Sequence, residues 1–399
     1  MEKKKFKLGL LPKLLIAIVL GIIIGQFFPV WFCRVVVTAS SIFSSFLKFI
    51  IPLMIVAYVT MGIADLKSGA GKLLLITVAL AYGSTLIAGS ASYLVSANLF
   101  PSFMSEGALE QIAATADNSL VSYISISIPP LLDTLSAVVL AFVLGLCMST
   151  LRGKTIGDTL YNSMKDFSGI IDQVLHSVII PLLPFYIFGI FLSMTQSGQV
   201  SGILGIFLKL IVIIFVMTVV LLLIQFSIAG LVARQNPLKM LRTMMTAYMT
   251  ALGTQSSAAT IPVTLAQTVK IGVRPEVAGF VVPLCATIHL SGSMMKIVAC
   301  SLAVMMLSGL DVSMGTYSGF ILLLGITMIA APGVPGGAIM AAIGLLESML
   351  GFDENMIGLM IATYIAMDSF GTATNVTGDG AIAVIVNAID SRMIRREKR

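Results

Sequence analysis

Apolar runs long enough to cross a bilayer recur along this chain and limit what it can fold into. A helix needs about 20 apolar residues to span the hydrocarbon core, and it pairs all of its own backbone groups there. Such runs lie near residues 8–28, 36–63, 73–100, 130–150, 168–195, 202–232, 277–307 and 356–388. We therefore expect an all-α membrane protein with roughly eight transmembrane helices.

The composition agrees with an integral membrane protein. Hydrophobic residues make up 58% of the chain and charged residues 11%, whereas charged residues make up roughly 25% of soluble proteins. The first run has no small-residue cleavage site after it, so we expect a retained span and not a signal peptide. The cysteines lack metal-ligand spacing, so we expect no disulfide framework. No organic cofactor is indicated.

Basic residues occupy alternate loops. Lys and Arg concentrate near 3–7, 67–72, 152–165, 234–242, 270–274 and 392–399, whereas acidic residues dominate the intervening loops, with Arg34 as a basic exception. Basic loops stay in the cytoplasm, which predicts a multi-pass protein of the plasma (inner) membrane with both termini inside. The net charge of +6 follows from this topology. The expected partner is the lipid bilayer and not nucleic acid.

Two further apolar regions are interrupted by polar or helix-breaking residues. Region 241–270 breaks at Gly253–Ser257, and region 317–350 breaks at Pro332–Gly337. Each half is too short to span, and proline and glycine must end a helix. Each region is therefore expected to form a re-entrant hairpin, one from each side of the bilayer.

Each expected hairpin is followed by a span with a polar interruption. These are A-T-I-H-L-S-G-S-M at 286–294 and D-S-F-G-T-A-T-N-V-T-G-D-G at 368–380. A hairpin and a broken helix that occur twice in opposite senses predict an inverted repeat with a binding site between its halves.

The last span carries its polar groups on one helical face. Asp368, Thr372, Asn375 and Asp379 are spaced i, i+4, i+7 and i+11, which places them together. Ionised carboxylates cannot face acyl chains cheaply, so we expect them to meet sodium ions or a substrate ammonium. Carboxylates paired with basic side chains of the same protein, or turned outward, would remove this argument.

These segments resemble a known family. The first hairpin carries G-T-Q-S-S-A-A-T-I-P-V-T, the second carries G-V-P-G-G-A-I-M, and the last span carries D-x-x-x-T-x-x-N-V-T-G-D. Together they are similar to the dicarboxylate/amino acid:cation symporters, which include the glutamate transporters. The chain looks like a divergent bacterial or archaeal member. The motifs lie between residues 241 and 387, and the first six spans match by hydropathy alone.

The resemblance implies a homotrimer with an elevator mechanism. Residues 1–70 and 130–195 would form a fixed scaffold. Residues 71–100 and 202–390, which include both hairpins and both broken helices, would move as the transport domain. The second hairpin would act as the outer gate.

The resemblance also implies a substrate site. In the family the aspartate binds the substrate α-ammonium, the asparagine and the serines of the first hairpin tip bind its α-carboxylate, the threonine orders the site, and the second hairpin tip closes over it. The matching or neighbouring residues here are Asp368, Thr372, Asn375, Ser256, Ser257, Ser293, Gly371, Gly333 and Val334.

Sodium sites follow from the same resemblance. Asn375 and Asp379 would hold one sodium ion together with backbone carbonyls near Cys285. A second ion would use the carbonyl of Thr287 and those of the second hairpin around 328–331.

Two departures from the family pattern change the expected substrate and ions. Acidic-substrate members place an arginine where this chain has Gly371 or Gln255, so a second substrate carboxylate would be poorly paired and we expect a neutral amino acid.

The second departure is His289-Leu290-Ser291-Gly292-Ser293, which stands where the family has Asn-Met-Asp-Gly-Thr. His289, Ser291 and Lys296 are thus candidates for a coupling switch in which an imidazole or fixed ammonium replaces a cation. The alternative is a neutral, hydrogen-bonded His289 with Lys296 paired to a carboxylate or carbonyls.

The sequence gives weaker support to other function classes. The runner-up functions are a cation-independent amino-acid exchanger and a dicarboxylate carrier, and a channel lined by the polar midplane is less favoured. V-T-G-D-G resembles the motif of aspartyl membrane proteases only superficially, because Val376 replaces a glycine and a second aspartate motif is missing. We therefore expect no enzyme activity.

Overall fold

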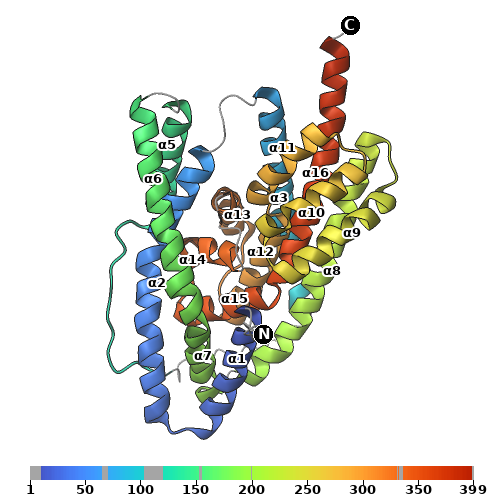
Figure 1. The fold of residues 1–399 in the computed structure, drawn as a ribbon. Coiled ribbons are helices and arrows are strands. Elements are labelled where there is room, and N and C mark those ends of the chain that lie inside the picture. Colours follow the sequence, from blue (N-terminus) through green and yellow to red (C-terminus); the bar gives the residue numbers. More distant parts are fainter. Residues whose placement is uncertain are drawn as a thin grey trace, which may run out of the picture.

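The computed structural model describes residues 10–64, 71–102, 120–151, 155–198, 200–329, 331 and 336–397 (Figure 1). These residues form helices joined by turns and loops, and contain no β-strand. The helices are α1 (Leu10–Phe27), α2 (Val30–Ala64), α3 (Gly71–Leu99), η1 (Phe100–Ser102), α5 (Thr134–Leu151), α6 (Thr155–Val174), η2 (Leu175–Ile179), α7 (Ile180–Gln196), α8 (Val200–Ala233), α9 (Pro237–Thr254), α10 (Ser257–Lys270), α11 (Pro275–Ile288), α12 (Ser291–Leu307), α13 (Met314–Met328), α14 (Gly337–Leu350), α15 (Glu354–Ala366) and α16 (Asp368–Glu397).

The helix lengths confirm the expected all-helical class. Among the described residues, five helical segments are long and apolar enough to cross a membrane, or six if α15 and α16, bent by 59°, form one span. The expected first and fourth spans are α1 and α5, each of 18 residues, near the shorter end of the spanning range. The count of eight stays a prediction.

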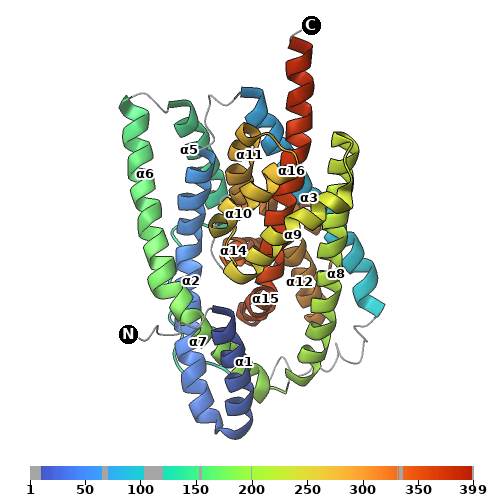
Figure 2. The same cartoon turned by 45° about the vertical axis from the view of Figure 1, so that its right-hand side comes forward.

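The helices pack in two groups. The N-terminal helices α1, α2, α5, α6 and α7 contact one another, while α3 packs on α12 and the helices α8 to α12 surround α16. Figures 1 and 2 show α2, α5 and α6 along one side and α8, α9 and α16 on the other, where the blue to cyan α3 also lies. The two groups meet where α14 contacts α2 and α5, and where α15 contacts α7 and α1.

Both predicted interrupted regions are divided between two helices. Between α9 and α10 the chain turns at Gln255, which has a left-handed φ of 53°, and at Ser256, whose side chain accepts a hydrogen bond from Ala259 N at 3.3 Å. Such a cap satisfies an otherwise unpaired amide of the helix end. Helices α13 and α14 are separated by residues 329–336, of which 330 and 332–335 lie outside the described part of the chain.

The two broken spans differ from expectation in one respect. Helices α11 and α12 are separated at His289 and Leu290, within the predicted segment. The last span breaks at Met367, whereas residues 368–380, where the break was expected, are helical. That expectation was wrong because helical backbone pairs its own amides, and the polar side chains of this stretch find partners on neighbouring helices.

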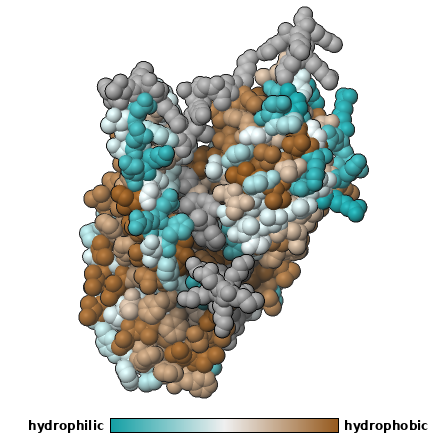
Figure 3. All heavy atoms as spheres, viewed as in Figure 1, coloured by the Kyte–Doolittle hydropathy of each residue, from teal (hydrophilic) through white to brown (hydrophobic). Residues whose placement is uncertain are grey.

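Arginines tie together the end of the molecule that carries the C-terminus. The Arg274 guanidinium, at the start of α11, bonds Asn387 and Asp390 of α16. Arg392 Nη2 donates to the carbonyl of Val232 at 2.8 Å. Figure 3 shows hydrophilic residues gathered toward this end and brown, hydrophobic surface over much of the body below it.

Glycines set the contact between α1 and α7. A Cβ at Gly21 would lie 2.8 Å from the carbonyl oxygen of Phe188 and 3.2 Å from the backbone nitrogen of Leu192. In a membrane, small residues allow helices to approach until their backbones touch. Gly21 therefore fixes the distance between these helices.

The variant Gly21→Ala is expected to lower the free energy of unfolding by about 1–3 kcal/mol, because the added methyl must push the helices apart. Gly83→Ala is the control, since a Cβ at Gly83 meets nothing within 4 Å and alanine favours a helix by roughly 0.5–1 kcal/mol. Thermal unfolding of both purified variants in detergent tests this. Equal effects would contradict the proposed packing role.

Candidate functional site

Helix α16 places the four predicted polar residues on one buried face. Asp368, Thr372, Asn375 and Asp379 are 5%, 7%, 2% and 1% exposed, and they belong to one uninterrupted helix. The predicted spacing is therefore present in the structure.

Asp368 lies at the bend between α15 and α16 and pairs with Lys296 of α12. The Lys296 Nζ lies 3.3 Å from Asp368 Oδ1, and it also donates to the carbonyls of Met367 at 3.2 Å and Asp368 at 3.4 Å. The other carboxylate oxygen, Oδ2, accepts the Gly336 N–H at 2.7 Å. The Asp368 carboxylate is thus engaged from two sides.

Gly371 provides the space for the Lys296 side chain. A Cβ at Gly371 would lie 2.2 Å from Lys296 Cε and 2.4 Å from Nζ. These distances are far below van der Waals contact, so any side chain at position 371 would displace the ammonium. The position at which acidic-substrate members would place an arginine is therefore filled here by a lysine from another helix.

Asn375 caps the first turn of α12. Its Oδ1 accepts the N–H of Gly292 at 2.7 Å and that of Ser293 at 3.3 Å, and its Nδ2 donates to Ser293 Oγ at 3.0 Å. The break at 289–290 leaves the first amides of α12 without partners inside the helix. A side chain of α16 supplies the missing acceptor, so Asn375 and Ser293 are brought together as predicted for a common site.

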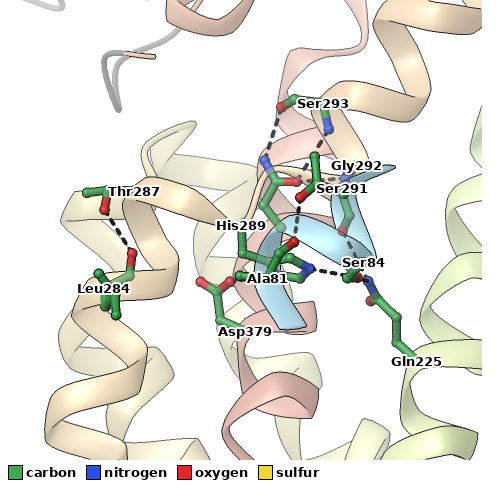
Figure 4. A network of polar contacts seen from close by, with 12 residues as sticks. Ala81, Ser84, Gln225, Leu284, Thr287, His289, Ser291, Gly292, Ser293 and Asp379 are labelled. Atoms are coloured by element: carbon green, nitrogen blue, oxygen red, sulfur yellow. Dashed lines mark hydrogen bonds and ion pairs between the residues drawn. The ribbon is translucent and has the colours of Figure 1, made fainter. Parts of the chain in front are cut away.

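Asp379 begins a chain of polar contacts that crosses four helices (Figure 4). Its Oδ1 lies 2.9 Å from His289 Nδ1, and His289 Nε2 lies 3.0 Å from Ser84 Oγ of α3. Gln225 Nε2 of α8 donates to Ser84 Oγ and to Ser291 Oγ, both at 3.1 Å. When Asp379 is ionised its carboxylate can only accept, and His289 Nδ1 is then the donor of this contact.

These pairings correct one expectation. The two carboxylates were expected to meet a substrate ammonium or inorganic cations, but Asp368 contacts Lys296 and Asp379 contacts His289. Lys296 therefore supplies a counter-charge for Asp368 from within the protein, and His289 supplies one for Asp379 when its imidazole is protonated. The alternative in which Lys296 pairs with a carboxylate and carbonyls is the arrangement that the structure contains.

The other predicted substrate residues lie around this core. Thr372 Oγ1 donates to the Asp368 carbonyl at 3.1 Å. Ser256 caps α10 and Ser257 is buried at the start of that helix, whereas the hydrogen bonds of Asn375 described above go to α12. Gly333 and Val334 lie outside the described residues.

Residues of the predicted sodium sites make hydrogen bonds within the protein. The carbonyl of Cys285 accepts the N–H of His289 at 2.8 Å, and the Thr287 hydroxyl donates to the carbonyl of Leu284 at 2.8 Å. Asn375 and Asp379 use their oxygens as described above. Within the described part of the chain, no group of three or more His, Cys, Asp or Glu residues could hold a metal ion.

Sequence reasoning missed three participants. Gln225 lies 7% exposed in the long apolar helix α8, and its Oε1 has no hydrogen-bond partner among the described residues. A single buried amide in such a helix is a recognisable signal. The sequence does not indicate the other two participants, because their roles depend on tertiary contacts. They are the Tyr364 ring, whose centroid lies 3.9 Å from Lys296 Nζ, and the Gly336 N–H.

Comparison with known proteins decides the family. The model of the sodium:dicarboxylate symporter family matches residues 10–389. This chain belongs to that family. A sodium:dicarboxylate symporter with several long apolar helices is a multi-pass membrane transporter and not an enzyme, so the predicted family and class are confirmed.

Relatives of this symporter carry a more specific name. A serine/threonine transporter SstT of Acinetobacter baumannii (strain AYE) is 27% identical over 401 residues, covering 97% of each chain. Another of that name, from Enterococcus faecalis (strain ATCC 700802 / V583), is 25% identical over 407 residues and covers 98% of this chain and 94% of the relative.

A double-mutant cycle tests the His289–Asp379 pair of the symporter. We expect His289→Gln and Asp379→Asn to show a coupling energy of about 0.5–3 kcal/mol in unfolding, as for residues in direct contact. The measurement is thermal unfolding of both single variants and the double variant. His289→Gln combined with Lys48→Gln, whose partner is Glu347, should be additive. Additivity of the first cycle would contradict the pairing.

Proposed function

We propose that this symporter carries a small neutral amino acid across the plasma membrane, coupled to sodium, to protons or to both. The family is named for sodium symport, and relatives matching nearly the whole chain are named serine/threonine transporters. The observation that carries the substrate class is the buried Asp368 beside Gly371, where the Lys296 side chain occupies the space that a Cβ would take. An amino group has a carboxylate to bind there, whereas a second substrate carboxylate has no arginine.

The absence of an arginine argues against acidic substrates. Gln255 occupies the turn between α9 and α10, and Gly371 is filled by Lys296. The Lys296 ammonium is already engaged by Asp368 and two carbonyls. A buried carboxylate without a paired donor costs several kcal/mol, so serine, threonine and alanine suit the site better than aspartate or succinate.

The substrate would enter by replacing a contact of the second hairpin. In this structure the Gly336 N–H occupies Asp368 Oδ2. When the hairpin opens, that oxygen becomes available to the substrate ammonium, while Oδ1 stays with Lys296. The substrate carboxylate would then bind near Asn375, Ser293 and the Ser256-Ser257 turn, and the segment containing Gly333 and Val334 would close over it.

We also propose the elevator arrangement, with eight spans, re-entrant hairpins at 241–270 and 317–350, and scaffold and transport domains as given above. Its support is that α1, α2, α5, α6 and α7 contact the other described helices mainly through α14 and α15. Few polar contacts of the described residues bridge them: Lys48 Nζ lies 3.6 Å from Glu347 Oε1, and Tyr186 donates to the carbonyl of Glu354 at 3.3 Å. A cross-link between positions 48 and 347 that left uptake intact would refute this motion.

The homotrimer and the cytoplasmic termini are proposals of the same kind. The basic residues at the turns near Arg234 and Arg274 and along the end of α16 support a cytoplasmic location by the positive-inside rule. The mass of the detergent-solubilised protein tests the trimer. Accessibility of an added C-terminal tag in sealed cells tests the orientation.

A cation-independent exchanger is the second candidate. Asp368 pairs with Lys296, and Asp379 contacts His289, whose protonated form would neutralise it; with both pairs formed, the empty transporter would need no inorganic cation at these carboxylates. In that case uptake would depend on amino acid inside the vesicle and not on an ion gradient.

In proteoliposomes we expect serine, threonine or alanine to compete for uptake and aspartate and succinate to compete poorly. Asp368→Asn should weaken apparent affinity about 30-fold or more, as for truncation of a buried charged contact worth roughly 2 kcal/mol. Asp166→Asn, an exposed carboxylate on α6, is the matched control and should resemble wild type. Stronger competition by aspartate than by serine would overturn the neutral-substrate assignment.

Separate gradients identify the coupling ion. We expect accumulation to follow an imposed sodium gradient, an imposed proton gradient or both, because Asp379 and His289 occupy the deep polar position of the transport core. Uptake is measured with each gradient alone and with neither. Strict dependence on several sodium ions would refute a role for His289 or Lys296 in replacing a cation, and uptake that needs only internal amino acid would establish exchange.

A further inference from the structure

Lys296 is a charged side chain sealed inside the protein. It is 0% exposed, and it extends from α12 to the bend between α15 and α16. Three oxygens accept from its Nζ: Met367 O at 3.2 Å, Asp368 O at 3.4 Å and Asp368 Oδ1 at 3.3 Å. A neutral amine has only two N–H donors, whereas an ammonium has three, so the three acceptors match the charged form.

The oxygens around Nζ are those that hold a small monovalent cation. Two are carbonyls at a helix break and one belongs to a carboxylate, and hard cations prefer such oxygen ligands. The end of α15 also carries the negative end of the helix dipole. The Tyr364 ring, with its centroid 3.9 Å from Nζ, adds a face that attracts cations.

The space around the Lys296 ammonium accommodates a side chain that extends from α12. Gly371 lies beside the Lys296 side chain, since a Cβ at this glycine would lie 2.4 Å from Nζ. The ammonium therefore fills a space kept open by the glycine, and it leaves Asp368 Oδ2 to the Gly336 N–H. A lysine that only filled space would require neither a glycine at position 371 nor three oxygen acceptors around its Nζ.

We propose that Lys296 is a tethered cation, seated in a cation-binding cage formed by Met367 O, Asp368 O and Asp368 Oδ1, where it takes the place of a free monovalent ion. The wild-type protein then binds no inorganic cation at this bend. Any sodium coupled to transport binds elsewhere. The binding part of this inference stands without the proposed function, and only its consequence for ion coupling rests on it.

Removing the ammonium should open the cage to a free ion. In Lys296→Met the carboxylate and both carbonyls remain, so sodium chloride, compared with choline chloride at equal ionic strength, should raise the Tm of this variant more than that of wild type. The double variant Lys296→Met/Asp368→Asn removes the charge that attracts the ion and should lose the additional shift. Lys270→Met, an exposed lysine at the end of α10, should respond as wild type does.

The outcomes separate the cage from other roles of the lysine. Equal sodium shifts in Lys296→Met and wild type, or an additional shift that persists in the double variant, would overturn the proposal. If Lys296→Met does not fold in choline, recovery of folded protein in sodium supports the cage and failure in both salts overturns it. Thermal shifts require no transport, so an absence of amino-acid uptake would reject the proposed function and leave this result standing.

Discussion

Two carboxylates buried on one helix of an apolar body are the constraint on which the rest of this structure depends. An isolated charge in such surroundings is too costly to keep. Basic side chains of the same chain contact both carboxylates. Helix α12 brings Lys296 to Asp368, and the break before α12 brings His289 to Asp379. The core that would carry a substrate is thus assembled around two internal ion contacts.

The helix breaks are what make those contacts possible. A continuous helix offers neither free amides nor free carbonyls to its neighbours. The break at His289 and Leu290 exposes the amides whose hydrogen bonds Asn375 accepts, and at the bend the Met367 carbonyl accepts from Lys296 as well as from the Phe370 N–H. Each break is stabilised by a side chain from the other broken helix, so α12 and α16 depend on each other for their ends.

Much of this arrangement is encoded locally and could be predicted. Hydropathy located the helices, the glycine and serine pattern located the turn at Gln255, and simple helical spacing placed Asp368 and Asp379 on one face. The partners could not be predicted in the same way, because Lys296 and Asp368 are far apart in the chain and meet only through packing. The break at Met367 was misplaced because polar side chains alone do not end a helix whose backbone pairs its own amides, and the contacts of Lys296 at this bend depend on packing.

The tight fit between Gly371 and Lys296 links two positions that are distant in sequence. A Cβ at position 371 would require the end of the Lys296 side chain to move, and loss of the lysine alone leaves a carboxylate without its partner. A substitution at either position therefore alters the contacts of the other, so the effect of an arginine at 371 depends on which residue occupies position 296.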